Sequence, residues 1–214
     1  MIHLGTGEQR ILLRARAHPW EPGGNWVIEG LIREFLARYE SDPAILKNIA
    51  FDILPLANKD GVARGLTRFN LKGADLNRGF SRTRTELGRI APENVALLEW
   101  LDRQQVFGTL PVLALDLHND CNGGLFIPQA DKDRMQVLAK LLRHHTFLPE
   151  NVIITPNGDG FTAGLHAQYG IATATLELNA KYIETIEQLP TAAHWRQLGR
   201  EFLTAALEFI STDR

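Results

Sequence analysis

Two histidines and a glutamate have the types and spacing of a metal site. His18 and Glu21 lie three residues apart in the segment HPWE, directly after the short apolar run RILLRARA. Where a strand runs into a tight turn, such a pair can offer one nitrogen and one carboxylate to the same cation. His118 ends a second apolar run, PVLALDLH, and completes the two-histidine, one-carboxylate set of catalytic zinc sites. Imidazole ligands favour zinc over magnesium or calcium. Taken singly, the HxxE pair could also be a solvated surface pair. His118 alone could be a hydrogen-bonded histidine of the core.

Glu177 interrupts the apolar run IATATLEL near its end. An ionised carboxylate in such a run is costly unless it has a partner or a task. One task is to accept the proton of an attacking water and then deliver it to a leaving nitrogen. The alternative is a glutamate at a strand end that simply reaches solvent.

The segment RFNLKGADLNRGF, residues 68–80, carries further polar groups that could act on a substrate. Arg68 and Arg78 could each bind a carboxylate through two parallel hydrogen bonds, or stabilise negative charge on a carbonyl oxygen. Asn77 adds a hydrogen-bonding side chain beside Arg78, and Asp75 could orient a metal-bound imidazole. A loop held by its own salt bridges is the alternative.

The hydrophobic pattern predicts the elements that must position these residues. Strands alternate with helices, which indicates an α/β sandwich with a mostly parallel sheet. His18, His118 and Glu177 each fall at the carboxyl end of a strand, where open α/β sheets bind their ligands. Residues 58–83 are expected to form a long irregular loop, and such loops are usually functional. The expected strands are 10–17, 49–57, 111–118, 124–127, 152–155 and 171–178, and the expected helices are 26–39, 91–105, 130–145, 161–170 and 191–211.

Composition limits the classes of protein and partner. A chain of 214 residues with 44% hydrophobic residues fits one compact domain. The formal net charge of -2 favours neither a nucleic acid nor an anionic membrane as partner. Neither a membrane span nor a signal peptide is evident, so a cytoplasmic location is the default expectation. The single cysteine, Cys121, excludes an intrachain disulfide; a small buried thiol near the site is favoured for it over a metal ligand.

Four segments taken together resemble the zinc metallocarboxypeptidase family, especially its cytosolic-carboxypeptidase-like branch. They are ARAHPWEPGGNWVIEGLI, LPLANKDGVARGLTRFNLKGADLNRGF, LALDLHND and TATLEL, in the family's order, from about residue 11 to residue 180. The resemblance implies a three-layer α/β sandwich with a mixed, mainly parallel sheet and one zinc ion per chain. It also implies zinc ligands His18, Glu21 and His118, an Arg68 that polarises the scissile carbonyl, Asn77 and Arg78 holding a terminal carboxylate, and Glu177 as general base.

The activity that this resemblance implies is hydrolysis of a C-terminal peptide bond by metal-activated water, on a peptide or a small carboxylate-bearing substrate. The family's preceding strand and helix are absent, so residues 1–214 are expected to form a single catalytic domain that is either minimal or N-terminally shortened. The family's mobile-loop tyrosine also has no counterpart, because Tyr169 is too close to Glu177 and is expected to pack at a helix end. An N-acyl amino acid deacylase of the aspartoacylase and succinylglutamate desuccinylase type is an alternative, and so is a non-catalytic carboxylate-binding module.

Overall fold

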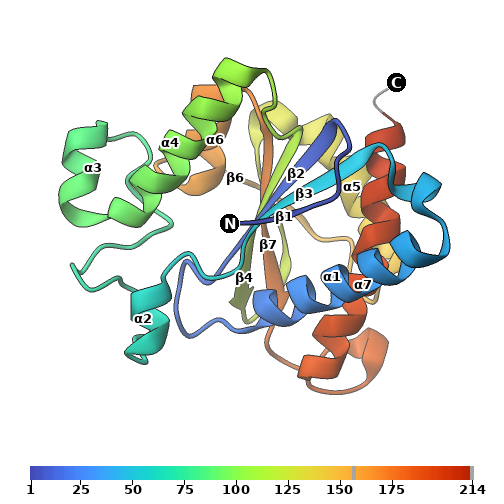
Figure 1. The fold of residues 1–214 in the computed structure, drawn as a ribbon. Helices are drawn as coiled ribbons and strands as arrows, with labels where there is room; N and C mark the ends of the chain where they lie inside the picture. The colour runs from blue at the N-terminus through green and yellow to red at the C-terminus, as the bar shows by residue number, and fades with distance from the viewer. Residues whose placement is uncertain (156–157, 213–214) are drawn as a thin grey trace.

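A seven-stranded mixed sheet forms the centre of the molecule (Figure 1). The computed structural model describes residues 1–155 and 158–212. The strands lie in the order β1-β3-β2-β4-β7-β5-β6. They are β1 (Ile2–Leu4), β2 (Gln9–Ala15), β3 (Ile49–Leu54), β4 (Leu113–Asp120), β5 (Gly124–Pro128), β6 (Val152–Thr155) and β7 (Ala172–Asn179).

The middle of the sheet is parallel, as the sequence predicted. β2 pairs in parallel with both β3 and β4, and β4 pairs in parallel with β7. β1 runs antiparallel to β3 and β5 runs antiparallel to β7. The carboxyl ends of β2, β4 and β7 therefore meet at one rim of the sheet, where His18, His118 and Glu177 are found.

Helices cover both faces of the sheet and make three layers (Figure 1). One face packs against α1 (Gly23–Ser41), α5 (Lys132–His145) and α7 (Ala192–Ser211) through the larger apolar cluster. The other face packs against α3 (Arg84–Ile90), α4 (Pro92–Phe107) and α6 (Phe161–Tyr169) through a smaller cluster. None of the helices in residues 1–155 and 158–212 has the length and apolar character needed to cross a bilayer.

The predicted α/β sandwich is confirmed. Among the described residues the sequence did not anticipate the edge strand β1 or two short helices, one inside the expected loop and one, α3, directly after it. The loop itself is mostly irregular but contains the short helix α2 (Lys59–Ala63). Helix α3 escaped prediction because it begins on a local signal, a capping box in which Thr83 and Glu86 bond each other's backbone, and buries only Leu87. Three-residue 3-10 turns η2 (Gln129–Asp131) and η3 (Glu184–Ile186) and the four-residue η1 (Pro43–Leu46) complete the chain.

Helices α1 and α7 touch backbone to backbone through two glycines. A Cβ on Gly199 would collide with the Val27 carbonyl oxygen, and a Cβ on Gly30 would collide with the Arg196 carbonyl oxygen. Neither backbone can yield without moving a whole helix. The absence of a side chain at these positions therefore sets the distance between the two helices.

Gly199→Ala is expected to lower the free energy of unfolding by about 1–3 kcal/mol, since overpacking in a fixed core forces backbone shifts. Gly88→Ala in α3 is the matched control, because a Cβ there would meet only Val95 Cγ2 at 3.9 Å. That change should be neutral or stabilise by up to ~1 kcal/mol through helix propensity. Urea unfolding of both variants checks this, and equal effects would contradict the close helix contact.

Candidate metal centre and the cavity beside it

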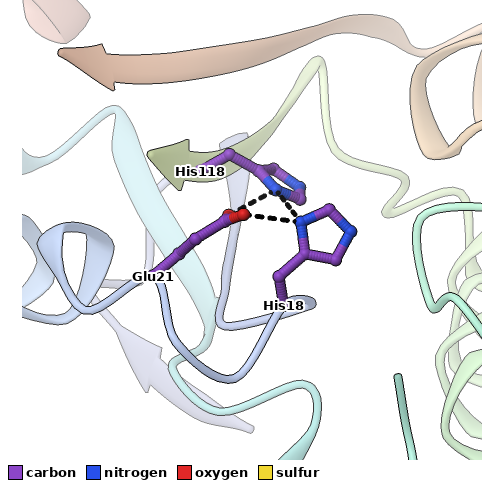
Figure 2. Close-up of side chains that lie close together, drawn as sticks. All are labelled: His18, Glu21 and His118. Carbon is purple, nitrogen blue, oxygen red and sulfur yellow. Dashed lines mark hydrogen bonds and ion pairs between the residues drawn. The ribbon is translucent and has the colours of Figure 1, made fainter. Parts of the chain in front are cut away.

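His18, Glu21 and His118 converge on one point at the carboxyl rim of the sheet (Figure 2). The Nδ1 atoms of His18 and His118 lie 3.1 Å apart. Glu21 bridges them, with Oε1 at 2.7 Å from His18 Nδ1 and Oε2 at 2.8 Å from His118 Nδ1. All three side chains are buried. The three residues that the sequence proposed as a ligand set are therefore brought together.

The turn between β2 and α1 is built so that Glu21 returns toward His18. Arg16, directly after β2, takes a left-handed conformation with φ of 60°, and the chain then bends toward Pro22, the N-cap residue of α1. The next residue, Gly23, has no room for a side chain, because a Cβ there would lie 2.6 Å from Asn119 Nδ2. The Gly23 N–H instead donates to Asn119 Oδ1 at 2.9 Å. The glycines of the segment EPGG thus allow the turn that carries Glu21 to pack directly on β4.

Each histidine presents its second ring nitrogen to a carboxylate. His18 Nε2 lies 3.1 Å from Asp75 Oδ1, and His118 Nε2 lies 2.9 Å from Asp116 Oδ2. Such carboxylates hold the proton on Nε2 and leave the Nδ1 lone pair for another partner, as is usual behind metal-bound histidines. The expected contact of Asp75 with an imidazole is present. Sequence reasoning missed Asp116, although its position two residues before His118 places both side chains on one face of the strand.

Without a metal, proton sharing holds this cluster together. Burial would disfavour charge on His118, but Asp116 and Glu21 outweigh that effect and raise its pKa to about 10. Burial likewise opposes ionisation of Glu21, but hydrogen bonds from His118 and His18 lower its pKa to about 2. The pKa of His18 is also raised, because Asp75 and Glu21 outweigh its burial. Metal binding would therefore release protons.

The donor set fits a zinc ion. Two imidazole nitrogens and one carboxylate oxygen lie within 4.8 Å of one another, and both imidazoles are already oriented by carboxylates. Three protein ligands of this kind leave one position open, as catalytic zinc sites do. Among the described residues no other group of at least three His, Cys, Asp or Glu side chains comes together in this way.

Glu177 lies beside this cluster on the next strand. The register pairs it with His118 across β4 and β7. Its Oε2 atom is buried and has no hydrogen-bond partner among the described residues. Burial, together with the carboxylates of Glu21 and Asp120, raises its pKa to about 7 despite the opposing effect of His118. A carboxyl group with that pKa can hold or release a proton near neutral pH.

A cavity of about 540 Å³ opens over the cluster. His18 and Glu21 line it together with Glu177, so the ligand set and the raised carboxyl group face the same space. Three polar loop residues that the sequence singled out, Arg68, Asn77 and Arg78, also line this cavity. A second cavity of about 370 Å³ shares Asn77, Arg78 and Glu177 with the first.

The loop is held partly by a salt bridge of its own, as the alternative from the sequence had it, and partly by contacts with other elements. Arg68 Nη2 lies 2.7 Å from Asp75 Oδ2, so Asp75 bridges Arg68 and His18. The Asn77 side chain accepts a hydrogen bond from the Phe161 N–H at 3.2 Å, at the start of α6. Arg78 is exposed, and its Nη1 donates to the Asn77 carbonyl oxygen at 2.8 Å. Its guanidinium makes no ion pair with a carboxylate among the described residues.

The expectation of a buried thiol was wrong for Cys121. Its side chain is exposed and lines the larger cavity, because β4 has ended at Asp120 and the chain turns there toward β5. Cys121 is not part of the His18, Glu21 and His118 group. Tyr169, by contrast, is the last residue of α6, as expected, and its hydroxyl donates to the Leu98 carbonyl oxygen.

Comparison with known proteins gives consistent matches. Residues 3–120 match the family described as zinc carboxypeptidase. Cytosolic carboxypeptidase 1 of Danio rerio is 32% identical over 108 residues, which is 50% of this chain and 9% of that protein. A metallo-carboxypeptidase from Burkholderia cenocepacia superposes with a TM-score of 0.77 at 21% identity, over 99% of this chain and 61% of that one.

A Pseudomonas aeruginosa metallo-carboxypeptidase, solved in complex with (2-guanidinoethylmercapto)succinic acid, superposes with a TM-score of 0.75 at 19% identity. The match covers 99% of this chain and 60% of that one. At these identities the two solved structures establish a shared fold. The chain thus spans about 60% of the length of these structural relatives, and its match covers a small part of the curated relative.

The raised pKa of Glu177 predicts a pH dependence of stability in the metal-free protein. The pKa rises from 4.5 to about 7 on folding, so the stability this proton provides is present below pH 4.5 and lost as pH rises through 7. Glu177→Gln does not titrate, and should gain stability relative to the unchanged chain between pH 5 and 8, by at most ~1.4 kcal/mol per pKa unit. Urea unfolding at both pH values, with exposed Glu150→Gln as control, measures this. A difference independent of pH would contradict the buried environment of Glu177.

Proposed function

Because this chain belongs to the zinc carboxypeptidase family, we propose that it hydrolyses the C-terminal peptide bond of a peptide or protein. The proposal includes residues 1–214 as one catalytic domain and one zinc ion per chain. The name of its curated relatives, cytosolic carboxypeptidase, supports the cytosol as its compartment.

One observation carries the proposal: groups with three different chemical abilities line a single cavity. Metal-binding side chains (His18 and Glu21), a carboxyl group of raised pKa (Glu177) and a guanidinium (Arg78) all face the space of about 540 Å³. A site that only binds carboxylates needs the guanidinium alone. Hydrolysis of a bond next to a carboxylate needs all three.

His18, Glu21 and His118 would hold the zinc ion, with Asp75 and Asp116 orienting the imidazoles. A zinc ion at that point supplies Lewis-acid chemistry, which polarises a carbonyl oxygen and makes water more acidic. Everything else in the reaction falls to the chain's own residues.

Glu177 is proposed as the general base. Its carboxylate would accept a proton from the attacking water and deliver it to the nitrogen of the leaving amino acid. In the metal-free protein its pKa is raised to about 7, and a base works best when its pKa lies near the working pH. Its buried, unpartnered Oε2 leaves an acceptor available for such a proton.

Arg78 and Asn77 are proposed to hold the terminal carboxylate of the substrate. Arg78 is exposed at the junction of the two cavities, and a guanidinium can grip a carboxylate with two parallel hydrogen bonds. Arg68 lines the larger cavity and is held by Asp75, so its charge is fixed near the metal ligands, where it would stabilise negative charge on the carbonyl oxygen.

Glu177→Gln is expected to lower kcat by at least ~10²-fold, because the amide keeps the size of the side chain but accepts no proton. Zinc content and melting temperature of the zinc-loaded variant should stay close to those of the unchanged chain. The measurement is peptide hydrolysis with zinc analysis, and Glu150→Gln serves as control. A fall of less than about tenfold with zinc retained would remove Glu177 from the role of base, and loss of zinc would make it a ligand.

Arg78→Ala is expected to impair hydrolysis of peptides with a free C-terminal carboxylate far more than hydrolysis of the same peptides with an amidated C-terminus. A hydrogen bond to a charged group is worth about 1.5–3 kcal/mol, or roughly 10- to 100-fold in kcat/KM. Arg64→Ala is the control, because Arg64 is exposed at the end of α2 and does not line either cavity. Equal losses on both substrates would show that Arg78 supports the loop instead.

A further inference from the structure

A fully buried arginine lies beneath the site, and the proposed mechanism leaves it without a role. Arg14 lies near the carboxyl end of β2 and has no exposed surface. Arginine is almost never fully buried unless it is paired. Its guanidinium lies among the side chains of the smaller apolar cluster, 5.0 Å from the ring centre of Phe161 and 5.7 Å from that of Phe80.

One side of the guanidinium reaches the metal centre. Arg14 Nη1 donates to Asp116 Oδ2 at 3.1 Å, and the register pairs these two residues across β2 and β4. The same oxygen of Asp116 lies 2.9 Å from His118 Nε2. Arg14 is thus linked through Asp116 to the ring of His118, whose Nδ1 atom faces Glu21 and His18.

The other side of the guanidinium reaches the substrate loop. Arg14 Nη2 donates to the Leu76 carbonyl oxygen at 2.7 Å and to Asn94 Oδ1 at 3.2 Å. Asn94, in α4, donates to the same Leu76 carbonyl at 3.0 Å and to the Arg78 carbonyl at 3.4 Å. Leu76 stands directly before Asn77 and Arg78, so its carbonyl fixes the backbone that carries both.

This arrangement is costly for stability alone. Arg14 Nε and Asp116 Oδ1 are buried without hydrogen-bond partners among the described residues. Replacing a buried ion pair with apolar side chains of similar volume is often neutral or stabilising. A second Arg–Asp pair on the same strand shows the contrast: Arg10 bonds both oxygens of Asp52, far from the rim, and is partly exposed.

We propose that Arg14 is a positioning residue that joins the two halves of the site, setting His118 through Asp116 and the Asn77–Arg78 backbone through Leu76. The inference rests on the proposed function. Arg14 would contact neither the zinc ion nor the substrate. It sets the distance between the metal centre and the group that holds the substrate carboxylate.

The first test replaces Arg14 with lysine, which keeps the charge but loses the planar fork that reaches Asp116 and Leu76 together. Arg10→Lys is the matched control. We expect Arg14→Lys to weaken binding of zinc alone by up to ~10-fold, the lower end of the range for loss of a carboxylate bonded directly to a ligand, while Arg10→Lys leaves it unchanged. Affinity is measured by competition with a chromophoric chelator, and melting temperatures show whether both variants fold.

The second test separates the two connections, and its double variant removes both buried charges together. Asp116→Asn is compared with the double variant Asp116→Asn, Arg14→Met. Because Arg14 acts on zinc only through Asp116, the double variant should bind zinc no more weakly than Asp116→Asn. Because it also loses the Leu76 contact, its KM for free-carboxylate peptides should rise by ~10-fold, on the scale of one hydrogen bond from a charged group, with little change for the amidated peptide.

The outcomes distinguish this inference from the proposed function. Absence of zinc binding by the unchanged chain would contradict the proposed function itself. Normal zinc binding by the unchanged chain, with equal affinities in Arg14→Lys and Arg10→Lys, would overturn only the role of Arg14. A double variant with the same KM as Asp116→Asn would also overturn the role of Arg14. This comparison can be made even if Arg14→Lys fails to fold.

Discussion

The parallel register of β2, β4 and β7 is the constraint on which the site depends. It places Arg14 opposite Asp116, and His118 opposite Glu177. A slip of β4 by one residue would turn His118 to the opposite face of the sheet, because side chains alternate along a strand. The backbone pairing of three strands therefore fixes both the metal centre and the carboxyl group beside it before any loop contributes.

The two faces of the sheet differ in what they bury: one is almost wholly apolar, and the other also holds the buried polar residues of the site. The face under α1, α5 and α7 carries the larger apolar cluster, and its helices approach closely through Gly30 and Gly199. The face under α4 and α6 carries the smaller cluster, with Arg14, Asp116 and His118 buried beside it. The buried Arg14 there donates its remaining hydrogen bonds to the loop and to α4, through the Leu76 carbonyl and Asn94.

Two carboxyl groups in one cavity have opposite electrostatic environments. Despite its burial, Glu21 is held between two imidazoles, which lowers its pKa to about 2. Glu177 is buried near other carboxylates, which raises its pKa to about 7. Pairs of titratable groups whose pKa values are pushed apart often divide acid, base and ligand roles between them. The separation fits the roles proposed for them, a permanently ionised ligand and a proton acceptor.

Hydrophobic periodicity and strand ends are local properties of the chain, so the sandwich and the residues that meet at its rim could be predicted from the sequence. The groups that lie behind these residues became known from the three-dimensional arrangement. Asp116 and Arg14 look like isolated polar residues in apolar strands until the register pairs them, and the partner of Asn77, the Phe161 N–H, comes from a distant segment. Cys121 is exposed, although it lies three residues after a buried histidine, because β4 ends between them. Such contacts depend on how strands and loops are placed in space, which spacing along one chain does not specify.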